Sequence, residues 1–158
     1  MSVILRLSCA LLICFIITEK SAYAASIAFN QAKFATIKEQ NKGEKWLMLM
    51  WSVDCPPCFK ELAVIQKLRK QEEKLNVVLV NADANDEAIQ ERVNVIKEFQ
   101  LHDLLNLHFV DGQAEHSRYL IDRSWFGELP RSYFVDAKGK FHGKSGLVKE
   151  SLITQWLL

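Results

Sequence analysis

The sequence predicts an α/β protein whose central, mostly parallel sheet is covered by helices on both faces. Two observations lead to this fold class. Short apolar runs, typical of buried strands, alternate along the chain with segments in which apolar residues recur at helical spacing. Near the C-terminus, two strand-like runs follow each other across a turn at 136–139, which predicts an antiparallel hairpin at the end of the sheet.

Length and composition indicate one ordinary globular domain. The chain has 158 residues, of which 49% are hydrophobic and 25% charged, and this excludes a disordered tail, a collagen-like fibre and a multi-span membrane protein. A net charge of +1 provides no basic patch for nucleic acid, so we expect no nucleic-acid partner. The function must therefore come from a local site.

The N-terminal segment has the pattern of an export signal. Its uninterrupted apolar part, 7–17, is too short for a spanning helix of about 20 residues but matches the apolar region of a secretory signal. Ala22-Tyr23-Ala24 supplies a small-x-small cleavage pattern. We expect cleavage after Ala24, a signal peptide over 1–24 and one domain over 25–158. An uncleaved N-terminal membrane anchor is the alternative.

The first half of the domain alternates between helix and strand. Apolar residues at helical spacing predict a helix over 29–40. The continuous apolar run at 46–53 predicts a strand that is buried on both faces. Helical spacing resumes over 59–73, in a helix that starts near Pro56, and 75–80 is a second strand of the buried type.

The second half repeats the alternation and ends in the hairpin. A helix is expected over 86–100, where Asn85 or Asp86 is placed to cap it. Its predicted apolar face consists of Ile89, Val93, Ile96 and Phe99. The remaining expected elements are a strand at 107–110, a helix at 114–121, hairpin strands at 131–135 and 140–143, and a helix at 149–158.

Two cysteines remain once the leader is removed. Cys9 and Cys14 leave with it, and Cys55 and Cys58 stay in an exported, oxidising compartment. A structural disulfide stabilises more when it closes a longer loop, so a pair separated by two residues is a poor structural link. This spacing favours a chemical role.

The Cys55-Pro56-Pro57-Cys58 motif lies where a predicted strand passes into a predicted helix. The helix dipole and the N–H of Cys58 favour a thiolate at Cys55, which lowers its pKa below about 8.5. Only the thiolate attacks a disulfide, so Cys55 is assigned as the nucleophile and Cys58 as the resolving thiol.

Neighbouring residues act against that thiolate. Asp54 and Glu61 are acidic, and Pro56 and Pro57 remove two backbone donors. A less stabilised thiolate makes the couple more reducing, which favours a disulfide reductase over a strong oxidant.

Other uses of the cysteine pair stay open. Zinc needs four ligands, and no histidine completes a finger-like spacing; the histidines are His102, His108, His116 and His142. Two thiolates suit Cu(I), so a copper chaperone is a second possibility. A disulfide oxidant or isomerase and a purely structural dithiol are the others. We also expect Trp51 and Trp125 to line the active-site surface.

The chain resembles the TlpA/ResA-like branch of periplasmic thiol–disulfide oxidoreductases, which have the thioredoxin fold. The resemblance rests on WLMLMWSVDCPPCFKEL at 46–62, with Glu61 three residues after the second cysteine, and on GELPRSYFVDAKGKF at 127–141. Cys55 and Pro130 are further apart than in plain thioredoxin, which fits the extra helical insertion of this branch, here placed at about 84–106.

The resemblance implies a central mixed sheet flanked by helices, with the insertion before the cis-proline strand. Pro130 falls on the family's cis-proline, and the Leu129 backbone would pair with an extended substrate. Trp51, Pro56 and Pro57 would complete the substrate surface. The buried acid of thioredoxin is replaced here by Leu49, and Glu61 is the candidate substitute in proton transfer.

The resemblance also implies partners and location. The redox-active Cys55–Cys58 disulfide would serve in place of any cofactor or metal. The substrates would be exported proteins with disulfides, with apocytochrome c as one candidate, and a membrane-bound thiol donor would supply electrons. The location would be the bacterial periplasm.

Overall fold

The structure is a computed structural model that describes residues 26–72 and 74–158. The expected signal peptide and the cleavage after Ala24 lie outside the described residues. Among those that are described, no helix combines the length and the apolar character needed to cross a membrane.

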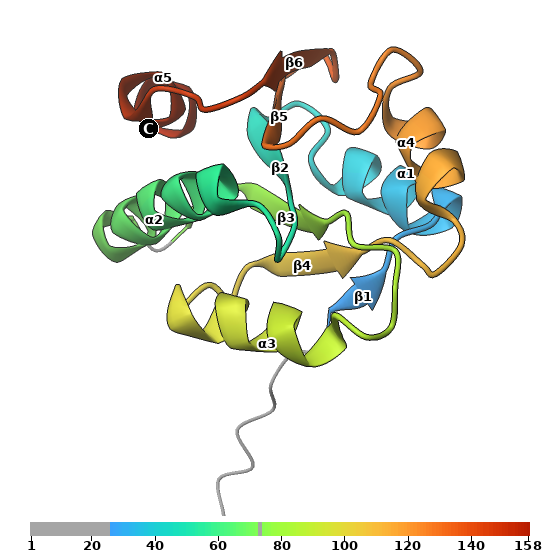
Figure 1. Cartoon of the computed structure of the whole chain (residues 1–158). Coiled ribbons are helices and arrows are strands. Elements are labelled where there is room, and N and C mark those ends of the chain that lie inside the picture. Colours follow the sequence, from blue (N-terminus) through green and yellow to red (C-terminus); the bar gives the residue numbers. More distant parts are fainter. Residues whose placement is uncertain (1–25, 73) are drawn as a thin grey trace, which may run out of the picture.

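In the described part of the chain, six strands form one sheet, which is mixed, as expected (Figure 1). They are β1 (Ile27–Ala28), β2 (Trp46–Trp51), β3 (Val77–Asn81), β4 (Leu105–His108), β5 (Arg131–Val135) and β6 (Phe141–Ser145). The spatial order is β1-β4-β3-β2-β5-β6. The first four of these are parallel, and β5 and β6 are antiparallel, which confirms the predicted hairpin.

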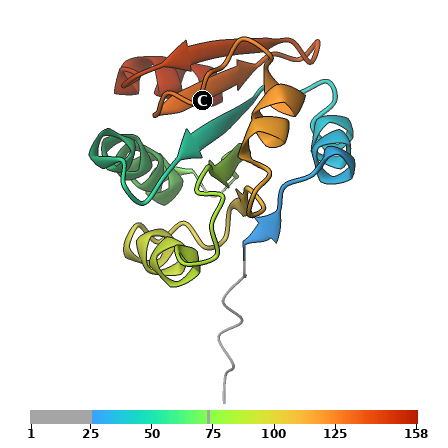
Figure 2. The ribbon, with the colours of Figure 1, turned by 45° about the vertical axis from the view of Figure 1, so that its right-hand side comes forward.

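Helices cover both faces of the sheet. They are α1 (Gln31–Gln40), α2 (Pro56–Gln71), α3 (Ile89–Glu98), α4 (Ala114–Ile121) and α5 (Glu150–Leu157). One core cluster contains buried residues of α2, α3 and α5, and the other contains buried residues of α1 with α4 packed against it. Figure 2 shows green α2 and yellow α3 on the opposite side of the sheet from cyan α1.

The central strand β2 divides its side chains between these two clusters. Leu47, Leu49 and Trp51 face the α2 side, and the alternate residues face the α1 side. This follows from the period of two along a strand. All six residues of β2 are buried, as the continuous apolar run predicts. The strand ends at Trp51, two residues before the predicted end, because Ser52 and Val53 bond to Asp83 instead of continuing the ladder.

Strands β1 and β4 also differ from the sequence prediction. The two-residue β1 was not expected, because two residues are too few to show periodicity. It pairs in parallel with β4 at the sheet edge. The strand expected at 107–110 lies at 105–108 instead, because Asn106 is a buried polar residue whose side-chain amide donates to the carbonyls of Leu101 and Leu104. Because Asn106 interrupts the apolar pattern, the sequence predicts a start two residues too late for this strand.

The predicted apolar face of α3 is confirmed only in part, by buried Ile96 and by Phe99, which packs against the same cluster. Ile89 is 49% exposed, and the buried residues are Arg92, Val95 and Ile96. A buried guanidinium needs hydrogen-bond acceptors, and the backbone carbonyls of Asp83 and Asn85 supply them. The Asn85 side chain accepts the N–H of Ala88 in the turn that leads into the helix.

The remaining helices lie close to their predicted positions. α1 begins two residues late, after Asn30, whose side chain accepts the Lys33 N–H at 2.8 Å and caps the helix. The segment 84–106, marked as an insertion by the resemblance, contains α3 and the first two residues of β4. It therefore adds both a helix and a strand between β3 and α4.

Candidate active site

The candidate site lies at the carboxyl ends of the parallel strands. In open α/β sheets, ligands bind beyond the carboxyl ends of the strands. β2 ends at Trp51, opposite Asn81 of β3. Because β5 is antiparallel, it begins at this same end of the sheet, with Arg131 opposite Met50. Pro130 precedes Arg131, so the chain passes the end of β2 at Pro130.

Cys55 and Cys58 form a disulfide at the N-terminus of α2. Cys55 is the N-cap residue of the helix, and the Cα atoms of the two cysteines are 5.3 Å apart. Cys55 is 7% exposed and Cys58 is fully buried. The outer sulfur therefore belongs to Cys55, as predicted.

The first turn of α2 has few backbone donors for a sulfur anion. Pro56 and Pro57 occupy its first two positions and have no N–H. The Cys58 N–H donates to the Cys55 carbonyl at 2.8 Å. The prediction that this N–H is free for the sulfur is therefore wrong for the disulfide form. Both prolines are exposed beside the disulfide.

The loop before β5 contains a cis bond between Leu129 and Pro130, which confirms that expectation. Leu129 is half-buried and packs against the cluster that contains both cysteines. The fold thus brings the two predicted parts of the site, the cysteine motif and the proline loop, to the same end of the molecule.

Glu61 is a buried carboxyl on α2, one turn after Cys58. Its side chain is 1% exposed. Its Oε1 accepts the Val148 N–H at 2.7 Å, and its Oε2 accepts the Ser132 hydroxyl at 3.1 Å. Burial raises the pKa of Glu61 above its ordinary value, although the two hydrogen bonds act against this rise.

Leu49 is fully packed where thioredoxin has its buried acid. It is 1% exposed and pairs with Ser132 across β2 and β5. Ser132 in turn donates to Glu61. The Glu61 carboxyl on α2 therefore contacts the residue that lies opposite Leu49 in the sheet.

The expected positions of two tryptophans at the surface are wrong. Trp51 is 1% exposed and Trp125 is 3% exposed. Trp51 packs in the α2-side cluster, and the Trp125 indole N–H donates to the Glu128 carbonyl at 2.9 Å. A tryptophan ring has a large apolar area, and packing it in the core removes more of that area from water than a surface position would. In this conformation Trp51 offers no area to a substrate.

A polar cluster around Arg131 holds the proline loop, and no local pattern in the sequence predicts this cluster. Arg131 donates to Asp122 at 2.8 Å and to the Ser145 hydroxyl at 2.7 Å, and its guanidinium lies over the Tyr133 ring. Burial opposes ionisation of Asp122, but hydrogen bonds from Ser124 and Arg131 outweigh it and lower the pKa of Asp122.

Two glycines lie next to this cluster. Gly127 has φ +103°, a conformation that side chains rarely adopt. Gly143 of β6 lies directly against Arg131, and a Cβ there would overlap the guanidinium. Directly before Gly127, Phe126 is 88% exposed, the most exposed of the large hydrophobic residues in the described part of the chain.

Comparison with known proteins gives a relative with a named activity. The chain is 31% identical over 117 residues to the thiol:disulfide interchange protein DsbE of Haemophilus influenzae. The match covers 73% of this chain and 59% of the length of that protein. No family model matches the sequence.

Solved structures are similar in fold. A thiol:disulfide interchange protein of the thioredoxin family from Chlorobium tepidum has a TM-score of 0.60 at 14% identity, over 76% of this chain and 81% of the other. A secreted disulfide oxidoreductase of Mycobacterium tuberculosis, described as homologous to E. coli DsbE, has a TM-score of 0.54 at 16% identity, over 75% and 84%. At these identities, the likeness shows the fold alone.

Proposed function

We propose that this chain, which has the fold of the thioredoxin-like oxidoreductases and is similar in sequence to a DsbE-type thiol:disulfide interchange protein, is itself a thiol–disulfide oxidoreductase. The observation that supports this most directly is the Cys55–Cys58 disulfide at the N-terminus of α2, with its outer sulfur near the surface and its inner sulfur buried.

The first step of the proposed reaction starts from the reduced protein. The Cys55 thiolate attacks one sulfur of a substrate disulfide, which breaks that bond and forms a mixed disulfide. The other substrate sulfur leaves as a thiolate and takes up a proton. Cys55 is the attacking residue because Cys58 has no exposed surface.

The second step releases the substrate. Cys58 loses its proton and attacks the Cys55 sulfur, which closes the protein disulfide and frees the second substrate thiol. Two electrons pass from the protein to the substrate. The helix supports this step because it holds Cys58 one turn from Cys55, with the two Cα atoms 5.3 Å apart.

We assign to Glu61 the proton that Cys58 loses. Its raised pKa keeps the carboxyl closer to the pH at which a thiol ionises, and a base is more useful when its pKa is near the working pH. The position one helical turn from Cys58 and the hydrogen bond to Ser132 support this role.

The net direction proposed is reduction. The paucity of donors at the first turn of α2 leaves the Cys55 thiolate less stabilised, and the dithiol form is then the more strongly reducing one. Exposed Asp54 beside Cys55 acts in the same direction.

Partners and location are proposed together. The substrates are exported proteins with disulfides, with apocytochrome c as one candidate, and the Leu129 backbone and the exposed Pro56 and Pro57 form part of the surface that meets them. A membrane-bound thiol donor returns the protein to its dithiol form, and no other cofactor takes part. The location is the bacterial envelope, which accords with the export pattern of the N-terminal segment.

The test begins with redox cycling of the purified protein. We expect the Cys55–Cys58 pair to equilibrate with dithiothreitol or glutathione and to reduce insulin, and a Cys55→Ser variant to do neither. A midpoint near about −120 mV, typical of strong oxidants, would contradict the reductase direction.

Substrates are tested by trapping. A Cys58→Ser variant lacks the resolving thiol, so mixed disulfides on Cys55 should accumulate in the native envelope. Cys55→Ser is the matched control, because it keeps the buried cysteine alone. Equal trapping by the two variants would contradict the assigned roles.

A further inference from the structure

The carboxylate of Asp83, just beyond the end of β3, bonds to the segment that leads into the cysteine motif. Its Oδ1 accepts the Ser52 hydroxyl at 2.6 Å, and its Oδ2 accepts the Val53 N–H at 2.9 Å. Hydrogen bonds to an ionised group are stronger than those between neutral groups. Asp83 therefore fixes the chain two residues before Cys55.

Ser52 continues this connection to Cys55. Its hydroxyl oxygen accepts the Asp54 N–H at 3.1 Å, and its carbonyl accepts the Cys55 N–H at 3.3 Å. The turn from the end of β2 to the N-cap of α2 is thus closed by hydrogen bonds to Ser52 and to Asp83. Three consecutive residues before Cys55 are bonded either to Asp83 or to Ser52.

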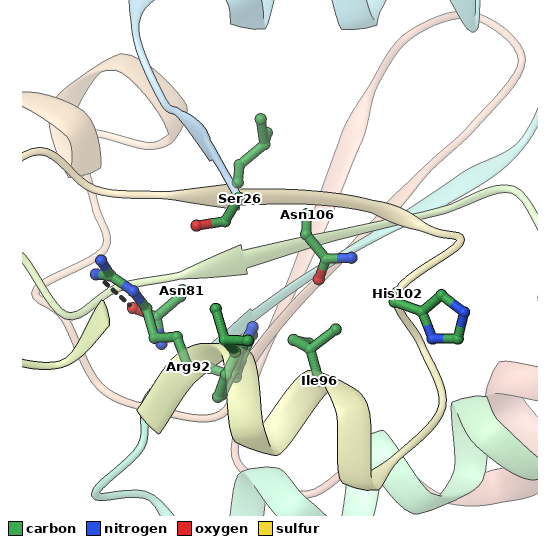
Figure 3. A pocket seen from close by; sticks show the side chains of 9 residues that line it. Ser26, Asn81, Arg92, Ile96, His102 and Asn106 are labelled. Atoms are coloured by element: carbon green, nitrogen blue, oxygen red, sulfur yellow. Dashed lines mark hydrogen bonds between the residues drawn. The ribbon is translucent and has the colours of Figure 1, made fainter. Parts of the chain in front are cut away.

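Asp83 itself is held from two sides. The Asn81 side-chain amide donates to Asp83 Oδ2 at 2.7 Å, and the Asp83 N–H donates to Asn81 Oδ1 at 3.1 Å. From α3, Arg92 donates to the Asp83 carbonyl at 2.9 Å and to Asn81 Oδ1 at 3.5 Å (Figure 3). Arg92 is 3% exposed, so these bonds form largely out of water.

We propose that Asp83 is a positioning residue that holds Cys55 in reach of Cys58. This inference rests on the proposed thiol–disulfide exchange and extends it to a residue outside the cysteine motif. The closing step depends on how often the two sulfurs meet, which is an effective concentration. A fixed turn before Cys55 raises that concentration and stabilises the disulfide relative to the dithiol.

The test is the equilibrium between protein and glutathione. Asp83→Asn keeps the size of the side chain, but its amide nitrogen meets the donors that the carboxylate accepted. We expect the equilibrium constant for forming the protein disulfide to fall about tenfold, which raises the midpoint by about 30 mV. An unchanged constant would overturn the proposal.

A second variant separates position from charge. Removing the Asp83 charge would also favour a thiolate nearby, and this acts in the same direction. Ser52→Ala changes no charge and removes the hydroxyl through which Asp83 and Asp54 are linked. We expect a smaller fall in the same constant. If Asp83→Asn shifts the constant and Ser52→Ala does not, the effect is one of charge and positioning is refuted.

Asp136→Asn is the matched control. Asp136 also accepts backbone N–H groups, from Lys138 and Lys140, but it lies after β5, at the opposite end of that strand from Pro130. We expect it to leave the constant unchanged. An equal shift in this variant would show a general loss of stability and would overturn the proposal.

This experiment also distinguishes the inference from the function on which it rests. Wild-type protein that does not equilibrate with glutathione contradicts the proposed exchange. Wild-type protein that does so, together with variants that match it, contradicts only the role of Asp83.

Discussion

Replacing Glu61 with Gln in the oxidised protein tests the consequence of a buried carboxyl. Glu61 is 1% exposed and accepts two hydrogen bonds, one from the Val148 N–H and one from Ser132. The amide oxygen of Gln can keep the bond to Val148, and its amide nitrogen can donate to the Ser132 hydroxyl. The substitution therefore removes the ionisation and leaves the packing and bonding in place.

The sign of the pH effect follows from the direction of the pKa shift. Because the pKa of Glu61 is raised on folding, the folded protein holds this proton more tightly than the unfolded chain does. The free energy of unfolding therefore falls as pH rises from 4.5, the ordinary value, through the raised folded value. Glu61→Gln lacks this loss. As the pH rises through this interval, the free energy of unfolding of Glu61→Gln relative to wild type should rise by about 1.4 kcal/mol for each unit between the ordinary and the folded pKa of Glu61.

The assay is urea denaturation of both proteins between pH 4 and 8. Keeping them oxidised stops Cys55 and Cys58 from titrating. Glu128→Gln is the control, because a hydrogen bond from Ser145 lowers the pKa of Glu128. The Glu128 carboxylate contributes to stability above its ordinary pKa of 4.5, and this contribution is lost as the pH falls. The difference in stability between Glu128→Gln and wild type therefore changes below pH 4.5, and with the opposite sign. A flat Glu61→Gln difference across the whole range would refute the reasoning.

The same variant tests the kinetic role of Glu61. If its carboxyl takes the Cys58 proton, Glu61→Gln should slow insulin reduction and shift its pH profile. A slower rate with an unchanged profile would assign Glu61 to the structure alone.

Three further substitutions have expected effects on stability, each measured as a change in the free energy of unfolding in urea. Gly127→Ala places a side chain at φ +103° and should destabilise by about 1–2 kcal/mol; no change would mean that the loop relaxes freely. Leu79→Ala, at a fully buried position in β3, should destabilise by about 2–5 kcal/mol, and a value below about 1 would contradict the packing described. Arg131→Met removes the guanidinium that donates to Asp122 and Ser145 and should destabilise by about 1–3 kcal/mol, whereas a neutral result would show that this cluster does not support the proline loop.

Much of the fold could be predicted because its signals are local. The continuous apolar run of β2 and the cysteine motif after it fix a strand, a turn and a helix within a few residues of each other. The cis bond before Pro130 followed only from the resemblance, since a proline at the start of a strand has a simpler explanation.

The rest depends on contacts between distant parts of the chain. Asp83 and Ser52 are 31 residues apart, and Asp83 lies in no motif that the sequence analysis identified. Arg92 looks like a solvent-facing charge in a helix, and only the carbonyl groups at the end of β3 explain its burial. The same applies to Asp122 and Arg131, which belong to different elements and meet only after folding.

The contact between Gly143 and Arg131 has a consequence for how a client protein is received. The guanidinium crosses the backbone of β6 and ties the hairpin to Asp122, at the base of the segment that ends in Pro130. The segment before Pro130 therefore cannot shift without displacing the Arg131 side chain from Gly143 and Asp122. Under the proposed function, the proline loop is preorganised, so binding a polypeptide costs little free energy for rearranging this loop. The affinity then depends mainly on the free energy needed to order the substrate in an extended conformation.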